Sequence, residues 1–93
     1  MVTALVMINA ERSKVNDVAS ALAAVDGISE VYSVAGQYDL VAIIRVKEND
    51  ELSDLVTKHM LNIDGIIASE TLVAFRVHSQ HDLDTMFSIG MDT

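Results

Sequence analysis

The chain has 93 residues, 51% of them hydrophobic, and a formal net charge of −8. So small a domain cannot enclose that many apolar side chains, so we expect it to form an oligomer. Its 6 basic residues form no cluster and face 14 acidic ones, which argues against direct binding to nucleic acid or to an anionic membrane. The absence of cysteine excludes disulfides and thiolate metal sites.

The amino terminus has neither the basic leader nor the small-residue cleavage site of a signal peptide. No apolar run reaches the roughly 18–20 residues that cross a bilayer. We therefore expect a cytoplasmic protein with one domain at residues 1–78 and a tail at 79–93.

The first part of the chain predicts a strand, a helix and a second strand. Residues 2–8 are apolar at nearly every position, which is typical of a strand buried on both faces. Ser13 can cap the helix that follows. The apolar face of this helix has the expected spacing: Val15, Val18, Ala19 and Leu22. Gly27 can end the helix, and residues 28–34 alternate as in a half-exposed strand.

The second part predicts the same order. Gly36 turns the chain into an apolar strand at 40–46. Asn49 is the predicted N-cap of a second helix. Its apolar face is formed by Leu52, Leu55, Val56 and either His59 or Met60. Gly65 then leads into a fourth strand at 66–77.

A weak internal repeat supports this division, because VDGI at 25–28 and IDGI at 63–66 each join a helix to a strand. Two β-α-β units interleave into a ferredoxin-like α+β fold, βαββαβ, with both helices on one sheet face. Three strands are apolar on both faces, so we expect another subunit on the free face: a dimeric α/β barrel formed by sheet-to-sheet pairing. In the tail, a short C-terminal helix is predicted by the spacing of Leu83, Met86 and Phe87.

No pattern in the sequence predicts catalysis. The serines lack a glycine elbow, and the glycines do not form a phosphate-binding loop. His78 and His81, near Asp82 and Asp84, are the nearest approach to a metal site, but so few ligands at a strand end are typical of surface residues. We therefore expect no metal and no cofactor.

The turn between the second and third predicted strands is rich in groups that bind ligands: Gly36, Gln37, Tyr38 and Asp39. A plain hairpin also explains them, with Gly36 at positive φ and Asp39 bonded to backbone amides. The functional hypothesis is a site for a small zwitterion, in which backbone amides bind the carboxylate and Asp39 binds the ammonium. Ser69 and Thr71, one pleat apart on one strand face, can complete such a site or be ordinary strand residues.

Residues 31–75 resemble the regulatory domain (RAM, regulation of amino acid metabolism) of Lrp/AsnC transcription regulators. The family pattern is a strand ending in Gly-x-Tyr/Phe-Asp, an apolar strand, a helix, a glycine and a strand bearing Ser or Thr. The residues that match it are Gly36, Tyr38, Asp39, Gly65, Ser69 and Thr71. The resemblance extends over residues 2–77, nearly the whole chain.

The resemblance implies subunits paired through their sheets and commonly assembled into octamers or discs. It also implies an amino-acid effector bound between neighbouring dimers by residues 36–39, Ser69 and Thr71. Full-length members begin with a winged helix-turn-helix, whereas the first predicted strand here starts at Val2, so we expect no DNA-binding module. Such a protein senses an amino acid by itself or co-assembles with a full-length Lrp/AsnC regulator.

Three alternatives stay open. A cofactor-free monooxygenase on a dimeric barrel needs an enclosed pocket with placed polar groups. With 4% aromatics, no tryptophan and histidines near element ends, we expect no enzyme. An amino-acid-binding ACT domain has the same strand order, but its ligand loop follows the first strand, where residues 9–12 lack the expected glycine. A purely structural assembly module needs no ligand at any of these residues.

Overall fold

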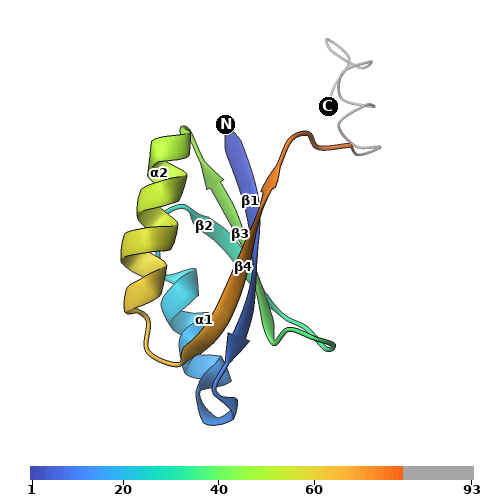
Figure 1. Cartoon of the computed structure of the whole chain (residues 1–93), viewed down its shortest axis with the longest axis vertical. Helices are drawn as coiled ribbons and strands as arrows, with labels where there is room; N and C mark the ends of the chain where they lie inside the picture. Colours follow the sequence, from blue (N-terminus) through green and yellow to red (C-terminus); the bar gives the residue numbers. More distant parts are fainter. Residues whose placement is uncertain (79–93) are drawn as a thin grey trace, which may run out of the picture.

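Four antiparallel strands form one sheet in the computed structural model, in which residues 1–78 are described. The strands are β1 (Val2–Ala10), β2 (Ile28–Ser33), β3 (Leu40–Val46) and β4 (Ile66–Ala74), in the spatial order β2-β3-β1-β4. The helices α1 (Val15–Ala23) and α2 (Asn49–Asp54) both cover one face of this sheet (Figure 1). The predicted ferredoxin-like βαββαβ fold is confirmed. The C-terminal helix predicted within 79–93 lies outside the described residues.

The helix starts differ from the sequence prediction. A 3-10 turn, η1 (Arg12–Lys14), precedes α1, so Ser13 lies inside that turn and α1 has no side-chain cap. Asn49 is the first residue of α2, not its N-cap. Both predicted caps are wrong because the chain leaves each strand in an irregular turn that residue type alone does not reveal.

The second helix changes its winding after α2. It continues as a π-helical turn, η2 (Leu55–His59), and ends in a 3-10 turn, η3 (Met60–Asn62). The last strand ends at Ala74 rather than at residue 77 as predicted. Among residues 1–78, none of these helical segments is long and apolar enough to cross a membrane.

The hydrophobic core lies between the sheet and the helices. The two central strands alternate strictly, and every second side chain is fully buried: Ala4, Val6, Ile8, Leu40, Ala42 and Ile44. The helices contribute Val18, Leu22, Leu52 and Leu55 to the same core. Burying one such Leu, Ile or Val side chain contributes about 1.5–3 kcal/mol. This alternation directs the other half of the side chains of both strands to the opposite sheet face.

A β-bulge in β2 allows Ile28 and Val31, which are three positions apart, to face the core together. Ile28 pairs with Ile44, but the next paired residue, Glu30, faces Ile43, which leaves Ser29 as an extra residue. The bulge changes the facing of the strand, so Ile28 and Val31 both lie on the core side. A strict period of two would have placed them on opposite faces.

The other sheet face is covered by no element among residues 1–78, as the right side of the sheet in Figure 1 shows. Residues paired across antiparallel strands share a face. One row across this open face therefore reads Glu30, Ile43, Leu5 and Leu72. The next row reads Tyr32, Val41, Met7 and Glu70. The face is apolar at its centre and carries polar groups at both edges.

Candidate functional site

The loop at residues 34–39 joins β2 to β3 and is anchored through Asp39. The backbone N–H of Asp39 donates to the carbonyl of Ile8 over 2.9 Å. The Asp39 carboxylate Oδ2 accepts a 2.9 Å hydrogen bond from the backbone N–H of Ala10. The carboxylate thus fixes the loop to the end of β1, and its Oδ1 is bonded to no protein group among residues 1–78.

The glycine of the loop, Gly36, lies in its exposed turn. Gly36 has φ +131°, a conformation that side chains rarely adopt, so the predicted positive φ is confirmed. A Cβ atom built at Gly36 would have no neighbour within 4 Å, and Gln37 is exposed. The backbone at Gly36 and Gln37 is therefore accessible to a ligand or to another subunit.

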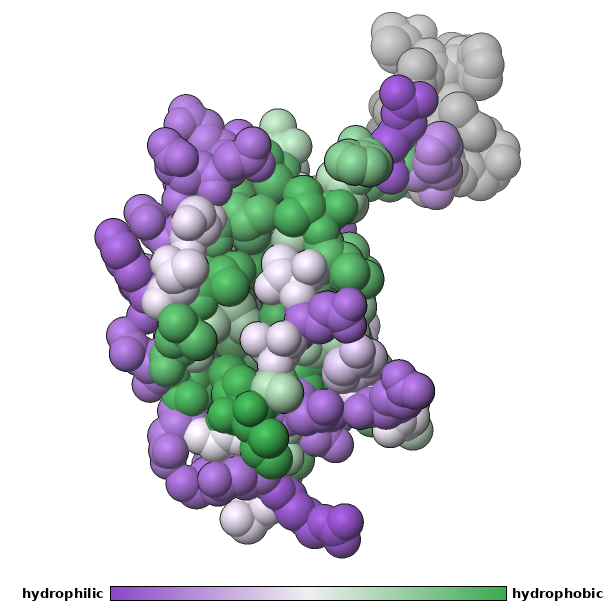
Figure 2. Space-filling view, in the orientation of Figure 1, coloured by the Kyte–Doolittle hydropathy of each residue, from purple (hydrophilic) through white to green (hydrophobic). Residues whose placement is uncertain are grey.

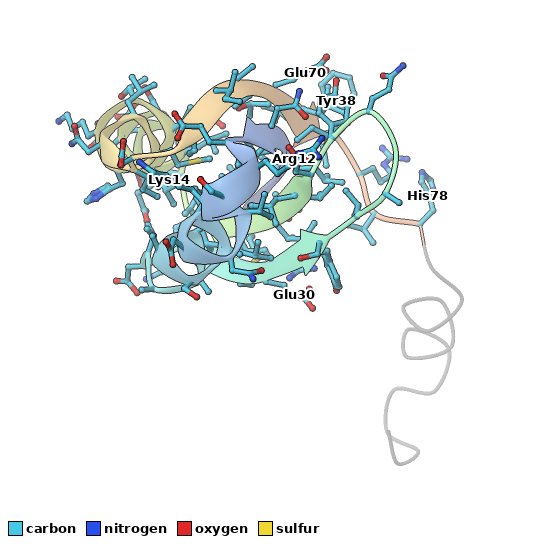
Figure 3. The ribbon with its side chains drawn as sticks, turned by 90° about the horizontal axis from the view of Figure 1, so that it is seen from below. Arg12, Lys14, Glu30, Tyr38, Glu70 and His78 are labelled. Carbon is cyan, nitrogen blue, oxygen red and sulfur yellow. The ribbon has the colours of Figure 1, made fainter. Side chains whose placement is uncertain are left out.

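Tyr38 reaches away from its own hairpin to the edge strand. Its hydroxyl donates a 2.6 Å hydrogen bond to Oε1 of Glu70 on β4, and Figure 3 shows the two side chains side by side. This hydrogen bond, reinforced by the negative charge of Glu70, raises the pKa of Tyr38. Two anchors, Asp39 on β1 and Tyr38 on β4, thus hold the carboxyl end of the loop.

The two predicted hydroxyls lie on the other side of β4 from Glu70. Ser69 is paired with Ile8 and Thr71 with Val6, so both lie on the face that the helices cover. Glu70 is paired with Met7 on the open face. The register therefore places the tyrosine–glutamate pair and the two hydroxyls on opposite faces of the same edge strand.

An apolar groove lies beside Ser69, between the end of the second helix and the start of β4. Its volume is about 270 Å³, and its walls include Val56, Met60, Leu61, Ile63, Ile67 and Ser69. Figure 2 shows hydrophobic surface in the region where the second helix meets β4. Leu61 and Ile67 are strongly exposed there, at 73% and 66% of their full surface.

The six predicted site residues therefore form two groups within one chain. The loop residues lie with Glu70, and the strand hydroxyls lie with the groove. Glu70 itself was missed by the sequence reasoning, although strand alternation between Ser69 and Thr71 already directs it to the opposite face. Only the path of the loop across the end of β1 reveals its contact with Tyr38.

The remaining charged contacts lie at the surface. Lys14 bonds Asp64 over 2.5 Å, which raises the pKa of the lysine and lowers that of the aspartate. Within residues 1–78, no three His, Cys, Asp or Glu side chains gather to hold a metal ion. Of the four residues that come nearest to a metal site in the sequence, His78 lies within that range. The other three, His81, Asp82 and Asp84, lie outside it.

Comparison with known proteins gives a consistent assignment. The model of the Lrp/AsnC ligand binding domain matches residues 3–84. The HTH-type transcriptional regulator FL11 of Pyrococcus furiosus is 32% identical over 79 residues, which are 85% of this chain and 52% of that protein. FL11 of Pyrococcus horikoshii is 31% identical over 77 residues, 83% of this chain and 50% of that protein. The chain thus spans about half the length of the curated relatives it matches.

Solved structures show the same fold. TTHA0845 from Thermus thermophilus is 42% identical, with a TM-score of 0.81 over 86% of this chain and 100% of that one. The transcriptional regulator NMB0573 from Neisseria meningitidis, solved as a complex with L-Met, has a TM-score of 0.74 over 85% of this chain and 54% of that one. Its identity is 12%, so this likeness concerns the fold alone.

Proposed function

Because this chain belongs to the Lrp/AsnC ligand-binding domain family, we propose that it is an oligomeric regulatory domain that binds a free amino acid. The backbone amides of Gly36 and Gln37 bind the carboxylate of the effector. The free oxygen of Asp39 attracts the ammonium group, and Tyr38 adds a hydrogen bond. Ser69 and Thr71 of a second subunit close the site.

The observation that carries this proposal is that both ends of the loop are held while its turn is exposed. The backbone N–H of Val34 donates to the carbonyl of Asp39 over 3.0 Å. Asp39 is held by two hydrogen bonds to β1, and Tyr38 by one to β4. Gly36 and Gln37 remain exposed beyond these anchors. A ligand that binds there orders few additional groups, so little binding free energy is lost to conformational entropy.

The proposal requires an assembly, because one chain places its two groups of site residues on opposite faces of β4. We propose a homodimer formed through the open sheet face, whose apolar centre is typical of an interface. Dimers then assemble further, with an octamer as the expected form. In that assembly the loop of one dimer meets the hydroxyls of the next.

Thermal unfolding with each of the twenty amino acids tests the proposal. Circular dichroism follows the unfolding, since the chain has no tryptophan. A ligand at 100 times its Kd adds about 2.7 kcal/mol per site and raises the midpoint. The decisive variant is Asp39→Asn, which keeps an oxygen for the Ala10 N–H but removes the charge, so it should lose the ligand shift and keep the fold.

Asp26→Asn is the matched control, because Asp26 is an exposed aspartate outside the loop. This variant should keep the ligand-induced rise in the unfolding midpoint. If no amino acid raises the midpoint at millimolar concentration while the oligomer stays intact by light scattering, effector binding is refuted. A structural assembly module, which the open apolar face also favours, then becomes the function.

We also propose that the domain can co-assemble with a full-length Lrp/AsnC regulator and change its state. A ligand or partner shifts an assembly only through different affinity for its states. Size-exclusion chromatography of a mixture with such a regulator should give a mixed species at the expense of both homo-oligomers. Two unchanged peaks after co-refolding would rule co-assembly out.

A further inference from the structure

The groove beside Ser69 is bordered by the most irregular part of the second helix. The π-helical turn η2 widens the helix at Leu55–His59, and Val56 within it lines the groove. Two side chains satisfy nearby backbone carbonyls: Thr57 Oγ1 donates to Ser53 over 2.6 Å, and Asn62 Nδ2 donates to Lys58 over 2.5 Å. Such π turns are frequent at functional sites.

The lining of the groove determines which side chain it can accept. None of its lining residues is charged, and the Ser69 hydroxyl is the polar side-chain group at its rim. A charged ligand side chain that entered would lose its water without gaining a partner. An aliphatic side chain would instead cover Leu61 and Ile67, which are otherwise exposed.

The size of the groove limits the ligand further. About 270 Å³ lies just below the roughly 300–1,000 Å³ typical of sites for drug-sized molecules. It therefore suits the side chain of a single amino acid. Ser69, on the same strand face as Thr71, lies where the polar end of such a ligand would meet the hydroxyls.

We infer that this groove is the side-chain pocket of the effector site and that it selects aliphatic amino acids of the size of leucine, isoleucine or methionine. The inference rests on the proposed function, since it assigns the side-chain specificity of that same site. The effector backbone lies between the loop of one dimer and Ser69 and Thr71 of another, and its side chain enters the groove.

The test compares affinities by isothermal titration calorimetry of the assembled full chain. The ligands are leucine, methionine and norleucine, with asparagine, lysine, glutamate and glycine for comparison. The aliphatic amino acids should bind at least about tenfold more tightly than glycine, since one methylene in an apolar pocket is worth about 10–200-fold. Ile67→Ser and Leu61→Ser, both at exposed positions, should weaken leucine binding by about tenfold.

Val77→Ser is the matched control, because Val77 is 61% exposed, much like Ile67, and does not line the groove. It should leave leucine affinity unchanged. Binding of polar or charged amino acids with no response to the aliphatic ones would overturn this inference and leave the proposed function standing. Leucine binding that is insensitive to both groove variants would also overturn it. If no amino acid binds at all, the proposed function itself is refuted.

Discussion

The hydroxyl of Tyr38 donates a 2.6 Å hydrogen bond to the carboxylate of Glu70, which joins the β2–β3 loop to the edge strand β4. Because β1 lies between β3 and β4, this bond spans a strand that belongs to neither partner. Together with the Ala10–Asp39 bond it fixes the position of the loop on the sheet. The accessible amides at Gly36 and Gln37 are thus presented from a defined place.

The Tyr38–Glu70 bond can be measured by tyrosine titration. The chain has two tyrosines and no tryptophan, so phenolate absorbance reports Tyr38 and Tyr32 alone. Hydrogen bonds to Glu70 and Glu30 raise the pKa of these two phenols above their ordinary value of about 10. Glu70→Gln should move one of the two midpoints down toward about 10 and leave the other in place.

The sign of the linked stability follows from the raised pKa of Tyr38. The protonated phenol favours the folded state, so its contribution is fully present below about pH 10 and is lost as the pH rises through the folded-state pKa. Glu51→Gln, an exposed carboxylate on α2, is the control and should change neither midpoint. An unchanged titration in Glu70→Gln would show that the bond does not form in solution.

Two glycines of the family pattern should differ in their tolerance of a side chain. Gly36 and Gly65 both have positive φ, at +131° and +104°. Alanine at either position strains the backbone by about 1–3 kcal/mol. At Gly65 the new Cβ would also lie 2.9 Å from Cγ2 of the fully buried Val18, whereas at Gly36 it meets nothing.

Overpacking of a core adds about 1–3 kcal/mol. Gly65→Ala should therefore lower the free energy of unfolding by about 2–6 kcal/mol, and Gly36→Ala by about 1–3 kcal/mol. Urea unfolding at one fixed protein concentration measures both, since subunit association shifts apparent stability. Equal losses would mean that the Val18 contact relaxes without cost.

The strands and helices could be predicted because each carries its own periodic signal. Strict alternation in the two central strands and the helical spacing of Val18 and Leu22 follow from burial on one side. The bulge at Ser29 could not be predicted, since an extra residue shows itself only in pairing with β3. Ser13 failed as a cap because the 3-10 turn η1 intervenes before α1.

The candidate site was predictable only in part. Residue type and the family pattern single out Tyr38 and Asp39 in the loop. The partner Glu70 depends on how the loop crosses the end of β1, a tertiary relationship with no local signal. The groove beside Ser69 is bordered by the π-helical turn η2, whereas the sequence predicts only an ordinary amphipathic helix there.

The open sheet face should control subunit association. Leu72 is 46% exposed on the edge strand β4 of that face, next to Leu5 of the central strand β1. A charge there would be buried without a partner in a sheet-to-sheet dimer, which is costly. Leu72→Glu should therefore dissociate the assembly while the circular dichroism spectrum of the fold remains.

Size-exclusion chromatography with light scattering measures the mass of the Leu72→Glu protein. Thr57→Glu adds the same charge on the exposed side of η2 and should keep the parental mass. An unchanged mass for Leu72→Glu would mean that association uses another surface.

The ion pair between Lys14 and Asp64 should make stability depend on acid pH. Lys14 joins the turn before α1 to the residue that precedes Gly65, where the carbonyl of Gly65 also accepts a 2.8 Å hydrogen bond from the N–H of Glu11. The hydrogen bond and charge of Lys14 lower the pKa of Asp64. A depressed folded-state pKa stabilises the protein above the unfolded value of about 3.9, and this contribution is lost as the pH falls through the lower folded value.

Asp64→Asn should therefore lower the unfolding midpoint at pH 7 by a small amount, because the pair is exposed to solvent. The difference from the parent should shrink at high salt and vanish in acid below both the folded and the unfolded pKa of Asp64. Asp26→Asn, whose side chain is in no ion pair within residues 1–78, should show no such convergence. If the difference in unfolding midpoint between Asp64→Asn and the parent stays constant into strong acid, the amide disturbs the turn itself. The ion pair with Lys14 would then not be the source of the stability.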